Sequence, residues 1–290
     1  MKPPVLDGEL LTDEASRQAT AVDFGHVVHN VPNGVLRPGS TEDIAKVVRW
    51  MGDHGKQVTA QGESHSVYGR SQVDDGIVVD MSGRNKIRSI HQGTIVVDAG
   101  AKWSDVLSAT LPEGLTPPVL TEYLELSVGG TIVVGGVGGT TWRYGVQSDN
   151  VLELEVVTGE GRVLTCSARD NTQLFNAMRA GLGQVGIVTR ATLMLRRAPE
   201  SVRRYQLVYA DLDTMLADQR LLLREGRWDY LQGAVVPREA GGWTYSVDGS
   251  KLFSGDDVPD DGTMLAGLQD DRAQAQINTF GYLDYVNRFT

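Results

Sequence analysis

The 290-residue sequence predicts a globular protein of mixed helices and strands in which strands dominate. Compact β-branched runs bounded by glycine, at Gly76–Met81 and Thr94–Ala99, are typical of strands. Val151–Thr158 and Arg162–Cys166 flank the glycine-rich segment Gly159–Gly161, which predicts a β-hairpin. Hydrophobic residues make up 41% of the chain and charged residues 22%, which is enough apolar material to bury a core.

Helices are expected at fewer places than strands. Apolar residues at helical spacing predict a helix that Ser40 or Thr41 caps and Gly55 ends. Other helices are expected from about Ser104, and from a cap at Asp170 through Met178. The remaining expected elements are a helix at Leu212–Arg224 and strands at Val58–Ala60, Gly186–Leu195, Tyr205–Tyr209, Tyr230–Val236 and Trp243–Val247.

The character of the chain changes near Ala198–Pro199, where we place a domain boundary. We therefore expect a first domain at residues 1–199 and a second at residues 200–290. The acidic segment Ser254–Gly262 is predicted to be a solvated, flexible loop.

Composition disfavours several classes of partner. With 27 Lys+Arg against 37 Asp+Glu the formal charge is −10, so nucleic acid is not an expected partner. No secretory signal is expected, and no run reaches the ~18 apolar residues of a membrane span. Cys166 is the single cysteine, which excludes an internal disulfide and fits the cytoplasm; we expect it to be buried rather than nucleophilic. His26 and His29 lack a matching third ligand, so no metal is expected.

Glycine is densest at Gly129–Gly139, with six glycines in eleven positions. Such a segment lets backbone N–H groups approach a phosphate or a flavin closely. The alternative is a set of tight turns that pack against a sheet. Gly181–Gly186 matches the dinucleotide pattern GxGxxG, but we reject that reading because a helix is expected before it and a strand after it, the reverse of what the pattern requires.

Another candidate site is the polar turn Gln61–Ser66, which follows the strand expected at Val58–Ala60. His65 lies in this turn between two serines. A loop histidine taken alone is more often solvent-exposed than functional, so its neighbours decide the interpretation.

Those neighbours carry a family resemblance. Gly62–Ser66 (GESHS) resembles the GxGHS turn of vanillyl-alcohol-oxidase-type flavoproteins, whose histidine is bonded covalently to FAD. Thr121–Thr131 (TEYLELSVGGT), Arg143–Glu153 (RYGVQSDNVLE) and Gly181–Ala191 (GLGQVGIVTRA) resemble cytokinin dehydrogenase. The resemblance extends from about Asp23 to Arg288, which is nearly the whole chain.

The resemblance implies an α+β fold, with a PCMH-type two-subdomain FAD-binding domain at residues 1–199 followed by the start of an α+β substrate domain at 200–290. Relatives of this type continue for roughly 150 residues or more, so the C-terminal part of the substrate domain is expected to be absent, as in a fragment or a truncated product. FAD is the implied cofactor, covalently bound through His65. The other positions implied for FAD are Ala60, Gln61, Gly62, Glu63, Ser64, Ser66, Arg70, Glu122, Ser127, Gly129, Gly130, Val133, Val137 and Val188.

Two of these positions depart from the family pattern. Ser64 replaces the second glycine of GxGHS, which is compatible with the turn only if the backbone there does not need a positive φ. Glu63 must point away from an anionic diphosphate.

The resemblance also implies a reaction. Glu122 stands where the family has an aspartate that hydrogen-bonds the substrate amine, and it is one methylene longer. It would accept the N–H proton while hydride leaves the adjacent carbon for flavin N5, giving an imine that water hydrolyses. Gln232 stands where the family has a glutamate at the pocket entrance, which weakens the case for the same amine substrate.

Three readings of function therefore stay open. The first is a cytokinin dehydrogenase-like enzyme of cytokinin metabolism that oxidises a C–N bond. The second is an oxidase of an alcohol or a sugar in the same superfamily, with Glu122 accepting an O–H proton. The third is a truncated, non-catalytic flavin-binding protein. The electron acceptor, oxygen or a quinone, does not follow from the residues.

Overall fold

The computed structural model describes residues 2–288 and separates into two compact units. The first unit holds the described residues up to Pro117, together with Leu124–Gly136 and Gln147–Arg196. The second holds Pro118–Tyr123, Val137–Val146 and the described residues from Arg197 onward. Two short segments from the first half of the chain thus fold with the C-terminal part. The roles expected for residues 1–199 and 200–290 stay predictions.

One sheet of the first unit has the strand order β1-β2-β4-β3. Its strands are β1 (Glu9–Leu11), β2 (Gly34–Arg37), β3 (Val58–Gln61) and β4 (Ile77–Asp80). β2 and β3 both run parallel to β4, which requires a crossover between them, and α2 (Thr41–Gly52) supplies it. Ile44 and Val47 of α2 are fully buried, so this helix contributes directly to the core.

The second sheet of this unit is antiparallel throughout and has the order β5-β6-β10-β8-β9. Its strands are β5 (Ile87–His91), β6 (Thr94–Asp98), β8 (Val151–Thr158), β9 (Val163–Ser167) and β10 (Gly186–Met194). β8 and β9 form the hairpin that the sequence predicts. The other elements here are α1 (Glu14–Ala19), α3 (Trp103–Thr110), η1 (Leu111–Glu113), β7 (Leu115–Thr116), α4 (Val128–Val134), η2 (Gln147–Asn150) and α6 (Thr172–Met178), and β11 (Arg196–Arg197) lies where the units meet in the chain.

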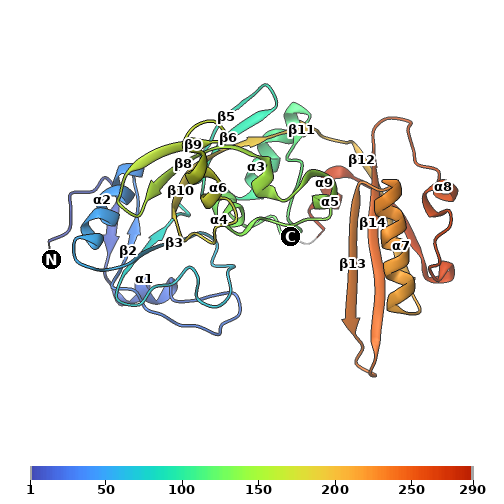
Figure 1. Ribbon diagram of the computed structural model, residues 1–290, viewed down its shortest axis with the longest axis horizontal. Coiled ribbons are helices and arrows are strands. Elements are labelled where there is room, and N and C mark those ends of the chain that lie inside the picture. Colours follow the sequence, from blue (N-terminus) through green and yellow to red (C-terminus); the bar gives the residue numbers. More distant parts are fainter. Residues whose placement is uncertain (1, 289–290) are drawn as a thin grey trace. The chain divides into compact units, whose positions relative to one another are not determined.

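The second unit is built on a sheet with the order β13-β14-β12-β15, along which α7 lies (Figure 1). Its core stacks Tyr205 on Trp228, with the ring centroids 5.2 Å apart. Gly249 makes room for this stack, because a Cβ there would lie 1.9 Å from the Trp228 ring. The elements are α5 (Thr141–Tyr144), β12 (Ser201–Tyr209), α7 (Leu212–Glu225), β13 (Tyr230–Pro237), β14 (Trp243–Phe253), α8 (Asp261–Leu265), η3 (Arg272–Gln274), β15 (Gln276–Gly281) and α9 (Tyr282–Val286).

The predicted mix of helices and strands is confirmed, but the sequence did not predict several elements, among them α1, α4, β2, β5 and β15, and it misplaced the ends of others. Ser40 caps α2 as expected, but the helix ends at Gly52, and Gly55 instead takes a positive φ in the turn that follows. The N-cap of α6 is Asn171 rather than Asp170. The predicted loop at Ser254–Gly262 is irregular only as far as Asp260, whose carboxylate caps α8 by accepting the Thr263 N–H.

Asp43 fastens the N-terminal segment to α2. Its buried carboxylate accepts the backbone N–H groups of Asp7, Gly8, Gly39 and Ser40. Burial alone would raise the pKa of this carboxyl, but the four N–H groups favour the charged form and hold the pKa below its usual 3.8.

We predict that Asp43→Asn lowers the free energy of unfolding at pH 7 by about 2–4 kcal/mol, because buried donors lose a charged acceptor. Since the folded-state pKa is lowered, this stabilisation is present above about pH 4 and is lost as the pH falls through the folded value. Urea unfolding measured from pH 7 to pH 2.5 should therefore show that acid lowers the free energy of unfolding less in the variant than in the wild type. Asp13→Asn, at the exposed cap of α1, is the control and should change stability little. Equal effects of the two variants would contradict the role of Asp43.

Candidate functional site

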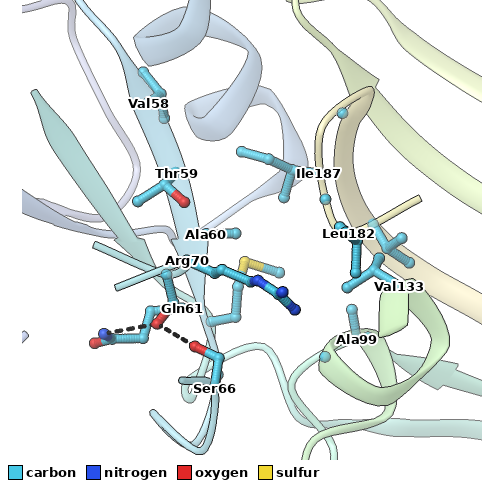
Figure 2. A pocket seen from close by; sticks show the side chains of 18 of the residues that line it. Val58, Thr59, Ala60, Gln61, Ser66, Arg70, Ala99, Val133, Leu182 and Ile187 are labelled. Carbon is cyan, nitrogen blue, oxygen red and sulfur yellow. Dashed lines mark hydrogen bonds between the residues drawn. The ribbon is translucent and has the colours of Figure 1, made fainter. Parts of the chain in front are cut away.

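The first unit contains a pocket of about 570 Å³, a volume typical of small-molecule sites. Its walls come from β3 and the turn after it, from α4, and from the segment that leads into β10. Figure 2 shows β3 on one side and Leu182 and Val133 on the other, with the side chain of Arg70 between them. Both sheets of the first unit therefore contribute to the pocket.

Most residues implied for FAD line this one pocket. They are Ala60, Gln61, Gly62, Glu63, Ser64, His65, Ser66, Arg70, Ser127, Gly129, Gly130, Val133 and Val188. Three further predicted site residues, Glu122, Val137 and Gln232, belong to the second unit. The structure thus brings together residues that are up to 128 positions apart in the chain.

The turn after β3 has a strained backbone. β3 ends at Gln61, whose carbonyl accepts the N–H of Met81, and the chain then turns sharply. Ser64 has a φ of 52°, in the left-handed region that glycine adopts without cost. The sequence analysis accepted a serine here only if the backbone did not need a positive φ. The turn does use a positive φ, so Ser64 bears the steric cost.

Two glycines let the backbone of this turn and of α4 approach their neighbours. A Cβ on Gly62 would lie 2.2 Å from the Ser127 Oγ, and a Cβ on Gly129 would lie 2.8 Å from the Cβ of Ala99. Gly129 and Gly130 belong to α4, so the first half of the glycine-rich segment is helical and does not form the tight turns considered as an alternative. The interpretation that glycines allow the backbone to approach its neighbours closely describes this half of the segment better.

The charges around the pocket are of both signs. Glu63 lines the pocket, but Lys102 lies 3.6 Å from its carboxylate and 3.1 Å from that of Glu125. The hydrogen bond to Glu125 and the two carboxylate charges raise the pKa of Lys102 despite its partial burial. Arg70 differs, because no described residue forms a hydrogen bond or ion pair with its guanidinium. The pocket therefore offers one cation whose charge no partner within residues 2–288 neutralises.

The side chain of His65 is exposed at the pocket wall and packs against Phe24, with ring centroids 4.0 Å apart. The segment that carries Phe24 is fastened to the turn, because the Phe24 N–H donates to the Ser66 carbonyl. Asp23 accepts the backbone N–H of Gly69, further along the same loop. The sequence analysis assigned no site role to Phe24 or Asp23, and its only signal for them was that the family resemblance begins there.

Sequence reasoning missed a whole wall of the pocket. The segment Leu182–Ile187 lines it, although its GxGxxG pattern was rejected. The rejection itself was correct, since α6 precedes the pattern and β10 follows it. Leu182 and Gly183 have φ values of 57° and 71°, and the Leu182 N–H donates to the Val133 carbonyl, so these residues form a turn against α4.

A separate polar cluster lies in the second unit. The Tyr230 hydroxyl is 2.6 Å from Oε1 of Glu122 and 2.8 Å from the side-chain amide of Gln232. Tyr230 is only 7% exposed, and burial raises the pKa of its phenol above the usual 10. Two residues that the resemblance assigned to the substrate side thus share one hydroxyl.

Other candidates are less informative. Cys166 is buried as predicted, and burial raises the pKa of its thiol to about 11, which disfavours the nucleophilic thiolate. Among residues 2–288, no group of three His, Cys, Asp or Glu side chains could hold a metal ion. Within the same residues, no helix is both long enough and apolar enough to span a membrane.

Comparisons with known proteins agree with this geometry. A family model described as an FAD binding domain matches residues 32–167. An uncharacterized oxidoreductase of the fasciation locus of Rhodococcoides fascians is 39% identical over 96% of this chain and 63% of its own length. Cytokinin dehydrogenase 9 of Oryza sativa subsp. japonica is 40% identical over 91% of this chain and 53% of its own length. Cytokinin dehydrogenase 3 of Arabidopsis thaliana is 40% identical over 79% and 45%, respectively.

Residues 32–167 match an FAD binding domain, and the relatives that resemble most of the chain are named as an oxidoreductase and as cytokinin dehydrogenases. The chain is thus similar to cytokinin dehydrogenases, and the predicted resemblance is confirmed. The chain spans 63% of the bacterial relative and about half of the rice relative.

Relief of the strained turn gives a stability prediction. Ser64→Gly removes a left-handed serine, worth about 1–2 kcal/mol, and adds chain entropy to the unfolded state, worth about 0.5–1 kcal/mol. We expect a net gain of about 0.5 kcal/mol in the free energy of unfolding, measured by urea denaturation. Gln92→Gly is the matched control, since Gln92 has a φ of 48° outside the pocket and should respond similarly. A loss of more than about 1 kcal/mol specific to Ser64→Gly would show that its side chain contributes more than its backbone costs.

Proposed function

We propose that the protein is an FAD-dependent oxidoreductase whose cofactor occupies the pocket of the first unit, in a PCMH-type domain of two subdomains, one around each sheet. The observation that carries the proposal is that thirteen residues implied for FAD by sequence line a single pocket. The matched FAD-binding domain at residues 32–167 gives independent support.

The chemistry of the lining fits this cofactor. A diphosphate carries negative charge, and Arg70 offers a guanidinium that pairs with no other residue described in the structure, together with the serine hydroxyls of the 61–66 turn. Gly62 and Gly130 have no side chain beside Ser127, so a ligand can approach their backbone closely. Val133, Val188 and Leu182 add the apolar surface that a flat ring system needs.

His65 is proposed as the covalent attachment point. Its side chain is exposed and lines the pocket in which the flavin is proposed to lie. Packing against Phe24 limits the rotation of the imidazole.

Glu122 is proposed as the proton acceptor. FAD, when bound, supplies the oxidant that takes a hydride from the substrate carbon. Glu122 would hold the N–H of an amine and take its proton, and only four residues separate it in the chain from Ser127 of the pocket. The proposed reaction is therefore oxidation of a C–N bond, after which water hydrolyses the imine.

Oxidation of an alcohol or a sugar is the second candidate. The observation that favours it is Gln232, which places a neutral amide beside the Tyr230 hydroxyl where the family has a carboxylate. A neutral amide attracts a cationic amine less than a carboxylate does. Oxygen and quinones are the proposed electron acceptors, and both should be assayed.

The cytoplasmic location stays a prediction that rests on the cysteine content.

Acid precipitation tests the cofactor and its attachment together. Wild-type protein purified with FAD should give a yellow pellet and an intact mass that includes FAD. His65→Ala should still bind FAD but release it into the acid supernatant, whereas His29→Ala should behave as the wild type does. Protein that binds no FAD would contradict the proposed function, and a yellow pellet from His65→Ala would contradict the attachment site.

Anaerobic flavin reduction tests the role of Glu122. Stopped-flow absorbance with isoprenoid amines, benzyl alcohols and aldoses should identify a donor that reduces the wild-type flavin. Glu122→Gln should then reduce the rate by about 10²–10⁴-fold without changing the flavin spectrum, because the proton acceptor is lost. Glu113→Gln, at an exposed position, should leave the rate unchanged. A Glu122→Gln rate within twofold of the wild type would remove Glu122 from the mechanism.

A further inference from the structure

The ring of Tyr230 is held tightly inside the second unit. Gly139 lies against it so closely that a Cβ there would be 2.2 Å from a ring carbon. The Leu231 N–H donates to the Gly139 carbonyl, which fixes this segment on β13. On another side Tyr285 meets the ring edge-on, with centroids 5.7 Å apart. The position of the hydroxyl is therefore set by packing around the ring.

The hydroxyl meets two polar side chains but carries one hydrogen. It lies 2.6 Å from the Glu122 carboxylate and 2.8 Å from the Gln232 amide. A carboxylate is the stronger acceptor, so the hydrogen goes to Glu122. The structure places Oε1 of Gln232 against the hydroxyl, and two acceptors cannot share its single hydrogen. A half-turn of the amide exchanges its oxygen and nitrogen, and an N–H of Gln232 then donates to the remaining lone pair of the hydroxyl.

Within residues 2–288, Oε1 of Glu122 accepts from Tyr230 and no residue hydrogen-bonds Oε2, which can therefore meet a different partner. A tyrosine phenol is protonated at neutral pH, and burial raises its pKa further, so the donor persists under working conditions. A glutamate is one methylene longer than an aspartate and has one more rotatable bond, so it gains more from such a restraint.

We propose that Tyr230 is a positioning residue that holds Glu122 in one orientation, and that Gln232 commits the hydroxyl hydrogen to Glu122. This inference rests on the proposed function, and it adds the group that orients the proton acceptor. It also explains what an amide does at position 232: a glutamate there would compete with Glu122 for the single hydrogen, whereas a glutamine can donate.

The test is a double-mutant cycle on the rate of anaerobic flavin reduction. Tyr230→Phe alone should lower the limiting reduction rate about 10- to 100-fold and change the half-saturating donor concentration by less than about threefold, because orientation acts mainly in the transition state. In the Glu122→Gln background the same change should alter the rate by less than twofold. Independent effects in the two backgrounds, or an unchanged rate for Tyr230→Phe, would overturn the proposal.

Gln232 has its own variants. Gln232→Met keeps the length of the side chain but cannot donate to the hydroxyl, and we expect a three- to tenfold lower limiting rate. Gln232→Glu should lower the rate at least as much, because two carboxylates then share one hydrogen. A rate for Gln232→Glu equal to that of the wild type would overturn the assignment of hydrogen direction.

A control separates positioning from general stability. Tyr205→Phe removes another buried hydroxyl of the same unit, which donates to Asp261 over 3.0 Å. It should lower the melting temperature to an extent similar to Tyr230→Phe and leave the reduction rate within twofold. A rate loss for Tyr205→Phe equal to that for Tyr230→Phe would assign both effects to stability and overturn the positioning role.

Failure of the proposed function would be seen separately. If no donor reduces the wild-type flavin, that function fails, and the contact is then tested by urea unfolding of the Tyr230→Phe, Glu122→Gln and doubly substituted proteins. A double variant whose midpoint loss is smaller than the sum of the single losses supports the hydrogen bond. Strictly additive losses overturn it.

Discussion

The pocket depends on glycines that let the backbone pack closely around Ser127 and α4. Gly62 comes from the turn after β3 and packs on the Ser127 side chain, while Gly129 packs on Ala99 beside β6. A Cβ at either position would lie within 3 Å of a neighbouring side chain, so α4 or that neighbour would have to shift. Both glycines line the pocket, together with the polar groups of the 61–66 turn and Arg70.

In the second unit a glycine also allows close packing, but here its neighbour is a large side chain. There a large side chain, Tyr230, fills the space that Gly139 leaves open, and its buried ring fixes a hydroxyl between Glu122 and Gln232. The short segment that carries Glu122 folds with residues more than 70 positions later in the chain. In this account the glycines of the first unit leave room for the cofactor. The buried ring of Tyr230 in the second unit orients the carboxylate of Glu122.

The sequence predicted most strands and the longer helices because their apolar residues follow the periods of buried elements, as in α2 and the β8–β9 hairpin, whereas short helices such as α1 and α4 were missed. It predicted the residues of the pocket through motif similarity rather than periodicity. At Ser64 the residue type gave no sign of the positive φ, which the surrounding turn imposes, and only the glycine of the family pattern at this position pointed to it. It also missed Leu182–Ile187 and the Tyr230 contact, since both depend on which distant segments pack together.

The central claim, that the pocket of the first unit binds FAD, is tested most directly by a crystal structure of the protein purified with FAD. We expect electron density for the whole cofactor in this pocket, with the diphosphate against the 61–66 turn and the Arg70 guanidinium, and continuous density from His65 to the flavin ring. Density for FAD at any other place, or an empty pocket in yellow crystals, would contradict the account.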